Sequence, residues 1–205
     1  DEKIKTVSEH NRGSGTMYQV ADFYQLRPLR PTDSQQLGQY FEQLSEETKG
    51  RFGPHPLSAA YASELCKATD SACHRLVLWI ENRICGYVIL DLRPYPEDYQ
   101  RYQKYGIELC AGLDAMLAPS IADDLQGKGL ASQMMPCLLD FARQHQVRHL
   151  VLMGGTQQGN DKAIRLYKRA GFIEVGQFVT QLLNYDMYLP LIPASNCKKS
   201  EDNSD

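Results

Sequence analysis

Apolar and polar positions along this chain alternate between two periods, one near two residues and one near 3.6. Runs with alternating or continuous apolar residues predict strands over residues 18–29, 74–80, 84–92, 107–123 and 148–155, with two more inside 173–191. Runs with helical spacing predict helices over 31–44, 57–68, 129–146 and 160–172. Residues 45–56 and 93–106 interrupt the pattern and are expected to form loops.

Residue chemistry at the ends of these runs supports the boundaries. Thr32 or Asp33 suits the N-cap of the first helix, and Asn160 that of the last, while Gly171 can take the left-handed position after it. The turn 81–83 between two β-branched runs is typical of a hairpin. Pro136 falls inside the third helix, where it should cost about 3 kcal/mol or bend it.

The resulting order, β-α-α-β-β-β-α-β-α-β-β, predicts an α/β fold with one mixed sheet and helices on both of its faces. With 205 residues the chain is long enough for one good core. We expect one domain over residues 17–192, with polar tails at 1–16 and 193–205, the first either native or in part the remnant of an expression tag.

Composition excludes several classes of protein. A net charge of −3 and a pI near 6.0 argue against a general nucleic-acid binder, which would carry a basic patch. The chain contains no run of 18 uninterrupted apolar residues, so we expect no membrane partner. The six cysteines form no CxxC pair and no His-x-Cys cluster, so we expect no metal site, reduced thiols and a cytoplasmic location.

Residues 121–135, IADDLQGKGLASQMM, set two glycines between an extended run and a helical run. A turn of this kind leaves several backbone N–H groups free at the positive end of a helix, which predicts a phosphate site. Gly127 and Gly129 would let the backbone approach the ligand, and Gln126 and Lys128 could add side-chain donors. The spacing fits neither a Walker loop nor a dinucleotide-binding fingerprint, so NAD binding by an oxidoreductase is not supported.

Gln126-x-x-Gly129-x-Ala131 matches instead the Q/R-x-x-G-x-G/A pyrophosphate loop, and here the sequence resembles the GCN5-related N-acetyltransferase (GNAT) family. A second motif agrees. Residues 160–172, NDKAIRLYKRAGF, match N-x-x-A-x-x-x-Y-x-x-x-G-F, and their spacing puts Asn160, Ala163 and Tyr167 on one helical face. The resemblance covers roughly residues 18–191 and includes the closing strand-like segment NYDMYL.

The resemblance implies a GNAT fold, a mostly antiparallel mixed sheet that splays open at the acetyl-CoA site. The pantetheine arm would lie in the gap between the strand ending near Asp123 and the strand over 149–154. Residues implied to bind acetyl-CoA, the cosubstrate, are Ile121, Ala122, Asp123, Gln126, Gly127, Lys128, Gly129, Leu130, Ala131, Ser132, Asn160, Ala163 and Tyr167. A backbone N–H near Ile121 or Ala122 would polarise the thioester carbonyl.

Members of this family transfer acetyl directly to an amine, so no cysteine is needed as a nucleophile. An amine with a pKa of about 10.4 is mostly protonated at pH 7, a handicap of roughly 4 to 5 kcal/mol, whereas the leaving thiol costs roughly 2 kcal/mol. Tyr167 is the predicted general acid for the thiolate. The base is less defined: Met116 occupies about the family position, Asp114 and Glu108 are the acidic candidates, and a water chain could replace both.

Two further segments have open interpretations. The insert with Tyr95, Tyr99, Tyr102 and Tyr105 could wall the acceptor pocket or be a packed surface loop. His55 lies between two prolines, where a structural turn is the simpler interpretation than a catalyst.

The sequence therefore predicts an acetyl-CoA-dependent N-acetyltransferase acting on a primary amine of a small molecule or a protein, as a monomer or homodimer. The alternative is a non-catalytic acyl-CoA-binding sensor or interaction module on the same fold. The acceptor cannot be identified from the sequence, because acceptor-facing residues lie on variable loops.

Overall fold

The fold is built on one eight-stranded sheet with the order β1-β2-β3-β4-β5-β6-β8-β7. The structure, a computed structural model, describes residues 17–21, 23–152 and 156–191. The strands are β1 (Tyr18–Ala21), β2 (Tyr24–Pro28), β3 (Cys73–Ile80), β4 (Arg83–Asp91), β5 (Asp114–Ile121), β6 (His149–Leu152), β7 (Ile173–Val179) and β8 (Leu183–Pro190). All neighbours in this sheet are antiparallel except β5 and β6, which are parallel. The predicted mixed, mostly antiparallel sheet is confirmed.

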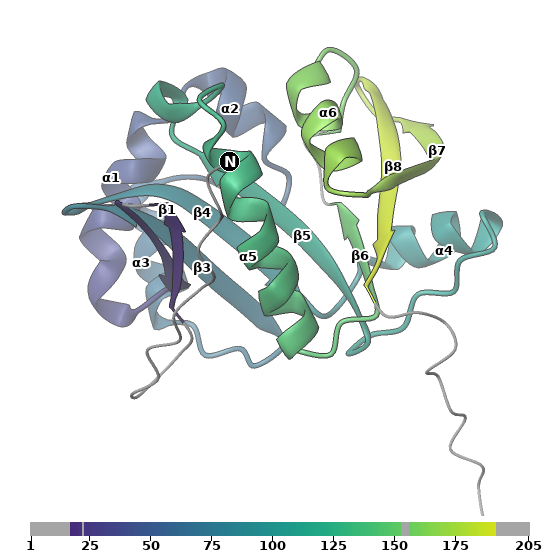
Figure 1. Cartoon of the computed structure of the whole chain (residues 1–205), viewed down its shortest axis with the longest axis horizontal. Helices are drawn as coiled ribbons and strands as arrows, with labels where there is room; N and C mark the ends of the chain where they lie inside the picture. Colours follow the sequence, from purple (N-terminus) through teal and green to yellow (C-terminus); the bar gives the residue numbers. More distant parts are fainter. Residues whose placement is uncertain (1–16, 22, 153–155, 192–205) are drawn as a thin grey trace, which may run out of the picture.

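Helices lie on both faces of the sheet, as predicted (Figure 1). They are α1 (Ser34–Gln43), α2 (Glu46–Arg51), α3 (Ala59–Lys67), α4 (Pro96–Lys104), α5 (Leu130–Gln144) and α6 (Asp161–Arg169), with short 3-10 turns at Pro31–Asp33 and Asp123–Leu125. Phe41 of α1 packs edge-on against Tyr87 of β4, whereas Phe141 of α5 packs against His74 of β3. Tyr87 pairs with Val77, and His74 lies an odd number of residues from Val77, so the two contacts are on opposite faces.

β5 and β6 separate along their length. Their pairing runs only from Asp114 opposite His149 to Leu117 opposite Leu152. β5 continues to Ile121, and over this last half the described residues pair it with β4 alone. Figure 1 shows the two strands diverging toward the end where α2 and α6 lie. The sheet is therefore splayed open between β5 and β6, at the place that the resemblance implied.

Four sequence-based assignments were wrong, one of them the expected strand over 107–123, of which only Asp114–Ile121 forms β5. The first expected strand is a hairpin of β1 and β2, because the chain turns near Phe23 and Tyr18 pairs with Leu26. Both expected loops contain a helix. α2 begins after Ser45, whose hydroxyl accepts a hydrogen bond from the Thr48 N–H. α4 begins with Pro96, which is tolerated there because the N–H groups of a first helical turn have no partner within the helix.

Pro136 lies within α5, which continues unbroken from Leu130 to Gln144. Its ring is exposed, as is Ser132, whose carbonyl loses its helical donor. Solvent can therefore satisfy that carbonyl, which explains why the proline does not end the helix.

The expected tails at 1–16 and 193–205, the residue at 192 and the strand end at 153–155 lie outside the described residues. In the described part of the chain, no helix combines the length and the apolar character needed to cross a membrane. Gly171 follows α6 with φ of +98°, which confirms its predicted left-handed conformation.

Candidate active site

The loop before α5 presents a set of unused backbone donors. Gly127 and Gly129 have φ of +74° and +82°, values that other L-residues rarely adopt. Gly129 is the N-cap of α5, so the first turn of the helix follows at once. Within the described part of the chain, the backbone N–H groups of residues 127–132 donate no hydrogen bond. These donors and the helix dipole make the loop suited to a diphosphate.

Gln126 turns back into the protein. Its Nε2 donates to the Ile121 carbonyl at 3.0 Å and to the Thr48 hydroxyl at 3.1 Å. The side chain thus fastens the loop to the end of β5 and to α2. The loop's donors for an anion are therefore main-chain groups, with the exposed Lys128 at its rim.

Asp123 connects the same loop to α2. Its carboxylate accepts hydrogen bonds from the Ser45 N–H at 2.8 Å, the Ser45 hydroxyl at 2.9 Å and the Thr48 hydroxyl at 2.6 Å. Burial raises the pKa of Asp123, but the hydrogen bonds from Thr48 and Ser45 outweigh it and lower the pKa below the usual carboxyl value. Sequence reasoning missed Ser45 and Thr48. Their one local signal was Ser45 as an N-cap residue followed by the acidic Glu46 and Glu47, which suits the start of a helix.

The main-chain groups of β5 alternate between its two edges. The Ala122 N–H donates to the Cys85 carbonyl of β4 at 2.9 Å. The Leu113 carbonyl accepts from the Arg148 N–H on the β6 side at 2.6 Å. Odd-numbered residues of β5 thus aim their main-chain groups at β6, and Ile121 does so beyond the end of the pairing. Of the two expected donors near the thioester, Ala122 is used in the sheet and Ile121 faces the opening.

α6 provides the other wall of the opening. Asn160 is its N-cap residue, and its Oδ1 accepts a hydrogen bond from Arg51 of α2 at 3.4 Å. Ala163 is half-buried one turn further on. Tyr167 is 5% exposed, and its ring packs edge-on against Phe172 at 5.4 Å. The described residues give its hydroxyl no hydrogen-bond partner, and burial raises the pKa of the phenol, which therefore stays protonated.

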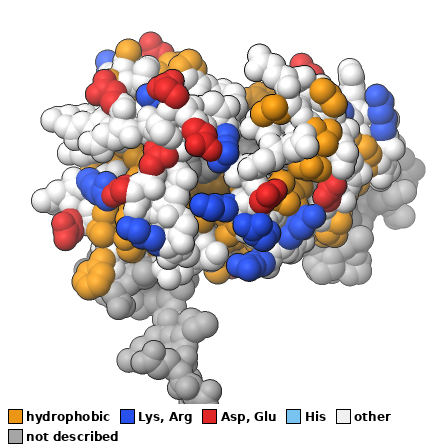
Figure 2. Space-filling view, turned by 90° about the horizontal axis from the view of Figure 1, so that it is seen from above, with side chains coloured by type: hydrophobic (Ala, Val, Ile, Leu, Met, Phe, Trp, Pro, Cys, Tyr) orange, Lys and Arg blue, Asp and Glu red, His pale blue; other side chains and the backbone are white. Residues whose placement is uncertain are grey.

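A cavity of about 310 Å³ lies between α2 and the segment before α6. Its lining comes from α2, from the segment before α6 and from the turn between β7 and β8: Glu46, Glu47, Gly50, Arg51, Gln157, Gln158, Gly159, Asn160 and Leu182. Figure 2 shows a recess between two raised halves of the molecule, with lysine and arginine side chains gathered along one side of it.

Neither predicted base lines this cavity, since Asp114 is the first residue of β5 and Glu108 lies in the segment before β5. Asp114 is fully buried and accepts four hydrogen bonds: from Arg148 Nη2 at 2.7 Å and Nε at 3.1 Å, from His149 Nδ1 at 2.9 Å, and from the Cys110 N–H at 2.6 Å. Burial raises the pKa of Asp114, but the hydrogen bonds from His149 and Arg148 lower it overall. Glu108 is exposed, and its carbonyl accepts from Arg148.

Distance also separates Asp114 from the opening. It lies three residues before the last β5–β6 pair, about 10 Å at 3.3 Å per residue. With its four acceptor sites filled, this carboxylate has no lone pair left for an amine. Its contacts fit a structural role at the closed end of the sheet.

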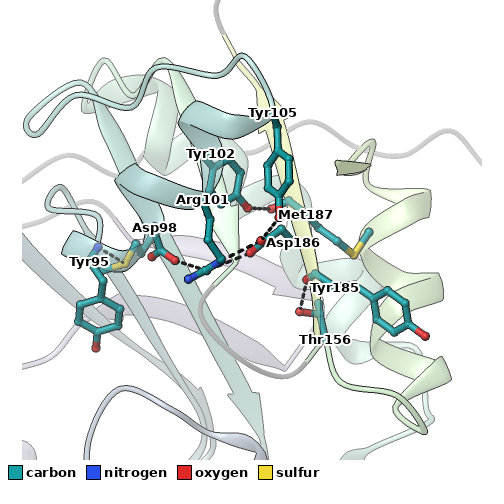
Figure 3. A network of polar contacts seen from close by, with 10 residues as sticks. Tyr95, Asp98, Arg101, Tyr102, Tyr105, Thr156, Tyr185, Asp186 and Met187 are labelled. Carbon is teal, nitrogen blue, oxygen red and sulfur yellow. Dashed lines mark hydrogen bonds and ion pairs between the residues drawn. The ribbon is translucent and has the colours of Figure 1, made fainter. Parts of the chain in front are cut away.

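Met116, which the resemblance put at about the position of the base, is buried and lies under the start of α4. Its Sδ accepts the Tyr95 N–H at 3.3 Å, and the Tyr95 ring is 40% exposed. α4 also docks on β8, as Figure 3 shows: Arg101 lies between Asp98 and Asp186, and its Nε donates to Asp186 at 2.9 Å. The insert is thus a helix that ties β5 to β8.

Tyrosines of the insert complete this contact. The Tyr102 hydroxyl donates to the Met187 carbonyl at 3.1 Å, and the Tyr105 hydroxyl donates to Asp186 at 2.9 Å (Figure 3). Gly176 of β7 lies directly against the Tyr105 ring, where an added Cβ would come within 2.1 Å of it. Two of the four tyrosines therefore hydrogen-bond the insert to β8, and Tyr95 is the most exposed of the four.

His55 belongs to a cluster of aromatic rings on the α1 face. Its Nε2 lies 3.1 Å from the Tyr87 hydroxyl, and its Nδ1 lies 2.8 Å from the Pro56 carbonyl. Because Nδ1 must donate to that carbonyl, Nε2 accepts from Tyr87. Burial lowers the pKa of His55 and favours this neutral form.

Residues 39–172, more than half of the chain, match the model of the acetyltransferase (GNAT) family. A comparison with curated proteins gives no match. Similar solved structures include the GNAT domain of S. lividans PAT, at 20% identity and a TM-score of 0.63 over 82% of this chain and 90% of that one. Ribosomal-protein-S5-alanine acetyltransferase from Vibrio fischeri has 14% identity and a TM-score of 0.65, over 85% and 96%.

Spermidine N-acetyltransferase from Vibrio cholerae, solved with CoA and spermine, has 21% identity and a TM-score of 0.62 over 83% of this chain and 97% of that one. At such identities the likeness is one of fold. The family match, the splayed sheet and the free amides before α5 agree, and the chain belongs to the GNAT family of acetyltransferases, acyltransferases that use acetyl-CoA.

Proposed function

We propose that this protein transfers the acetyl group of acetyl-CoA directly to a primary amine of a small molecule or a protein. The observation that carries the proposal is the row of unused N–H groups at residues 127–132, placed beside the opening between β5 and β6. Main-chain donors at a helix start suit the diphosphate of coenzyme A. The parted strands leave room for its extended arm.

The acceptor would enter through the cavity between α2 and the segment before α6. Two similar structures carry names that state amine substrates, spermidine and the alanine of a ribosomal protein. The cavity lining combines two glutamates, an arginine and several amides, and the glutamates Glu46 and Glu47 are largely exposed. Such a rim accommodates a positively charged amine before it loses its proton.

In this scheme the amine nitrogen forms a bond to the acetyl carbon as the carbon–sulfur bond breaks. Tyr167 donates its phenol proton to the departing sulfur. Its hydroxyl has no partner among the described residues, and burial keeps it protonated, as a general acid requires. The Ile121 N–H would polarise the thioester carbonyl from the edge of β5.

The amine proton leaves to solvent in this proposal. Asp114 and Glu108 were the predicted bases, but Asp114 has no free acceptor site and Glu108 lies in the exposed segment before β5. Water in the open cavity can accept the proton, which the unbound amine loses at a cost of roughly 4 to 5 kcal/mol at pH 7. The rate should therefore rise with pH until the amine is deprotonated.

The alternative is an acyl-CoA-binding sensor or interaction module without turnover. Met116, at about the position of the family's base, favours it, because a thioether cannot accept the amine proton. The two functions are separated by thiol release from acetyl-CoA over a broad panel of amines, peptides and aminoglycosides. Turnover with any amine supports the enzyme, and tight acetyl-CoA binding without turnover supports the sensor.

Gly129→Glu tests the coenzyme site. The added carboxylate would lie among the free amides and repel the diphosphate, so acetyl-CoA binding by calorimetry should be lost. Gly112→Glu is the matched control, because Gly112 has a similar φ of +81°, has equally open space and lies before β5. Unchanged affinity in Gly129→Glu would refute the placement of the diphosphate.

The proposal includes a cytoplasmic location and a monomeric or homodimeric state. Cys66, Cys73, Cys85, Cys110 and Cys137 are free thiols in the described structure, which supports a reducing compartment. Cys197 lies outside the described residues.

A further inference from the structure

The half of β5 that faces the opening offers few main-chain groups. The pairing of β5 with β4 keeps one register from Met116 to Ile121, without a bulge, so the alternation of edges holds throughout. Past Leu117, the two residues that aim at the opening are therefore residue 119 and Ile121. Any extended arm that lies along this edge must pair with these two residues.

Residue 119 is a proline, and proline has no N–H. Its carbonyl is the group that it presents to the opening. The Ile121 carbonyl is already engaged by Gln126 Nε2 at 3.0 Å. Over this stretch of the described structure, the edge thus carries one free acceptor, at Pro119, and one donor, the Ile121 N–H. The half-buried position of Pro119 agrees with an edge that is not covered by another strand.

The order of these groups matters for the reaction. The diphosphate site at residues 127–132 follows Ile121 in the chain, so a coenzyme arm that starts there passes Ile121 first and Pro119 next. The thioester, at the far end of the arm, would then lie between the levels of Ile121 and residue 119, where a main-chain N–H at either residue could reach its carbonyl. At residue 119 the edge presents a carbonyl alone, whereas any other residue type would present an N–H beside that carbonyl.

We propose that Pro119 is a positioning residue that withholds one of the two main-chain donors that could reach the thioester carbonyl and leaves the Ile121 N–H as the donor on this edge. The inference rests on the proposed function, because it needs acetyl-CoA in the opening. One donor to a developing oxyanion is worth on the order of 100- to 1,000-fold in kcat. Pro119 therefore holds the rate of acetyl transfer well below what this backbone would otherwise support.

Pro119→Ala tests the idea, because it restores an N–H that the strand aims at the opening. We expect kcat to rise on the order of tenfold, less than the full value of a donor because the site is not adapted to it. The carbonyl stretch of bound ¹³C-labelled acetyl-CoA should move to lower frequency. Pro28→Ala, in a strand far from β5, is the control for removing a strand proline and should change neither quantity.

A second control isolates the N–H itself. Lactic acid at position 119, introduced by nonsense suppression, has the alanine side chain but an ester in place of the amide. If it leaves kcat and the carbonyl stretch as in the wild type, the donor is responsible. An equal gain with lactic acid, or no change in Pro119→Ala, overturns the inference. Calorimetry on the wild type separates failure of this inference from failure of the proposed function. Absence of acetyl-CoA binding overturns both together.

Discussion

Replacing Asp114 by asparagine tests whether its carboxylate has a structural or a catalytic role. Asp114 is fully buried, and Arg148, its main partner, keeps 24% of its side chain exposed. Removing the charge leaves a mostly buried guanidinium without its partner and turns two of the four accepted hydrogen bonds into donor–donor contacts. Breaking a buried pair costs about 3 to 5 kcal/mol, and the exposure of Arg148 points to the lower end.

A loss of about 3 kcal/mol lowers Tm by roughly 6 to 12 °C for a chain of this size. The loss depends on pH in a defined direction. The pKa of Asp114 is lowered in the folded state, so its stabilisation is complete above the unfolded carboxyl pKa of about 3.9 and disappears as pH falls through the folded value. The Tm difference between wild type and variant should therefore be largest at neutral pH and shrink below about pH 4.

The assay pairs calorimetric Tm between pH 3.5 and 8 with kcat measured well below both transitions. For a structural carboxylate, we expect kcat within about threefold of the wild type, against the 100-fold or greater loss that removal of a general base produces. Glu108→Gln, in the exposed segment before β5, is the control and should change neither quantity. An unchanged Tm with a 100-fold loss of kcat would refute the reasoning and restore Asp114 as the base.

Three further predictions concern α6 and the docked insert. Tyr167→Phe should reduce kcat about 100-fold with unchanged acetyl-CoA affinity, whereas Tyr102→Phe, a buried tyrosine outside the site, should leave kcat alone. Because burial raises the pKa of Tyr167, its ionisation should cause no fall in kcat between pH 7 and 10; a basic limb that vanishes in Tyr167→Phe would contradict this. Gly176→Ala should cost about 1 to 3 kcal/mol in urea unfolding, since its Cβ displaces the Tyr105 ring, and the cost should disappear in a Tyr105→Ala background.

Features set by neighbouring residues were predicted correctly from the sequence. Gly171 has the positive φ predicted for the residue that follows the last helix, and the two glycines of the loop before α5, Gly127 and Gly129, also have positive φ. α6 begins directly after Asn160 and carries the buried Tyr167, as the helical spacing of the motif predicted. Helix periodicity and turn chemistry act within a few residues, so a single sequence contains the information that they need.

Contacts between distant segments were decided by the tertiary structure. Asp123 binds Ser45 and Thr48 more than 70 residues away, and α4 meets Asp186 of β8. Such pairs form because the order of the strands brings polar groups together, where they satisfy buried charges. They produce no periodic pattern in the sequence.

The role proposed for Pro119 depends on both the sequence and the tertiary structure. The sequence alone established that this residue lacks an N–H, but the strand register decided that the missing donor faces the opening and not β4. A shift of one residue in the register would turn each main-chain N–H and C=O of β5 to the opposite edge of the strand. Only the pairing with β4 could therefore assign that direction.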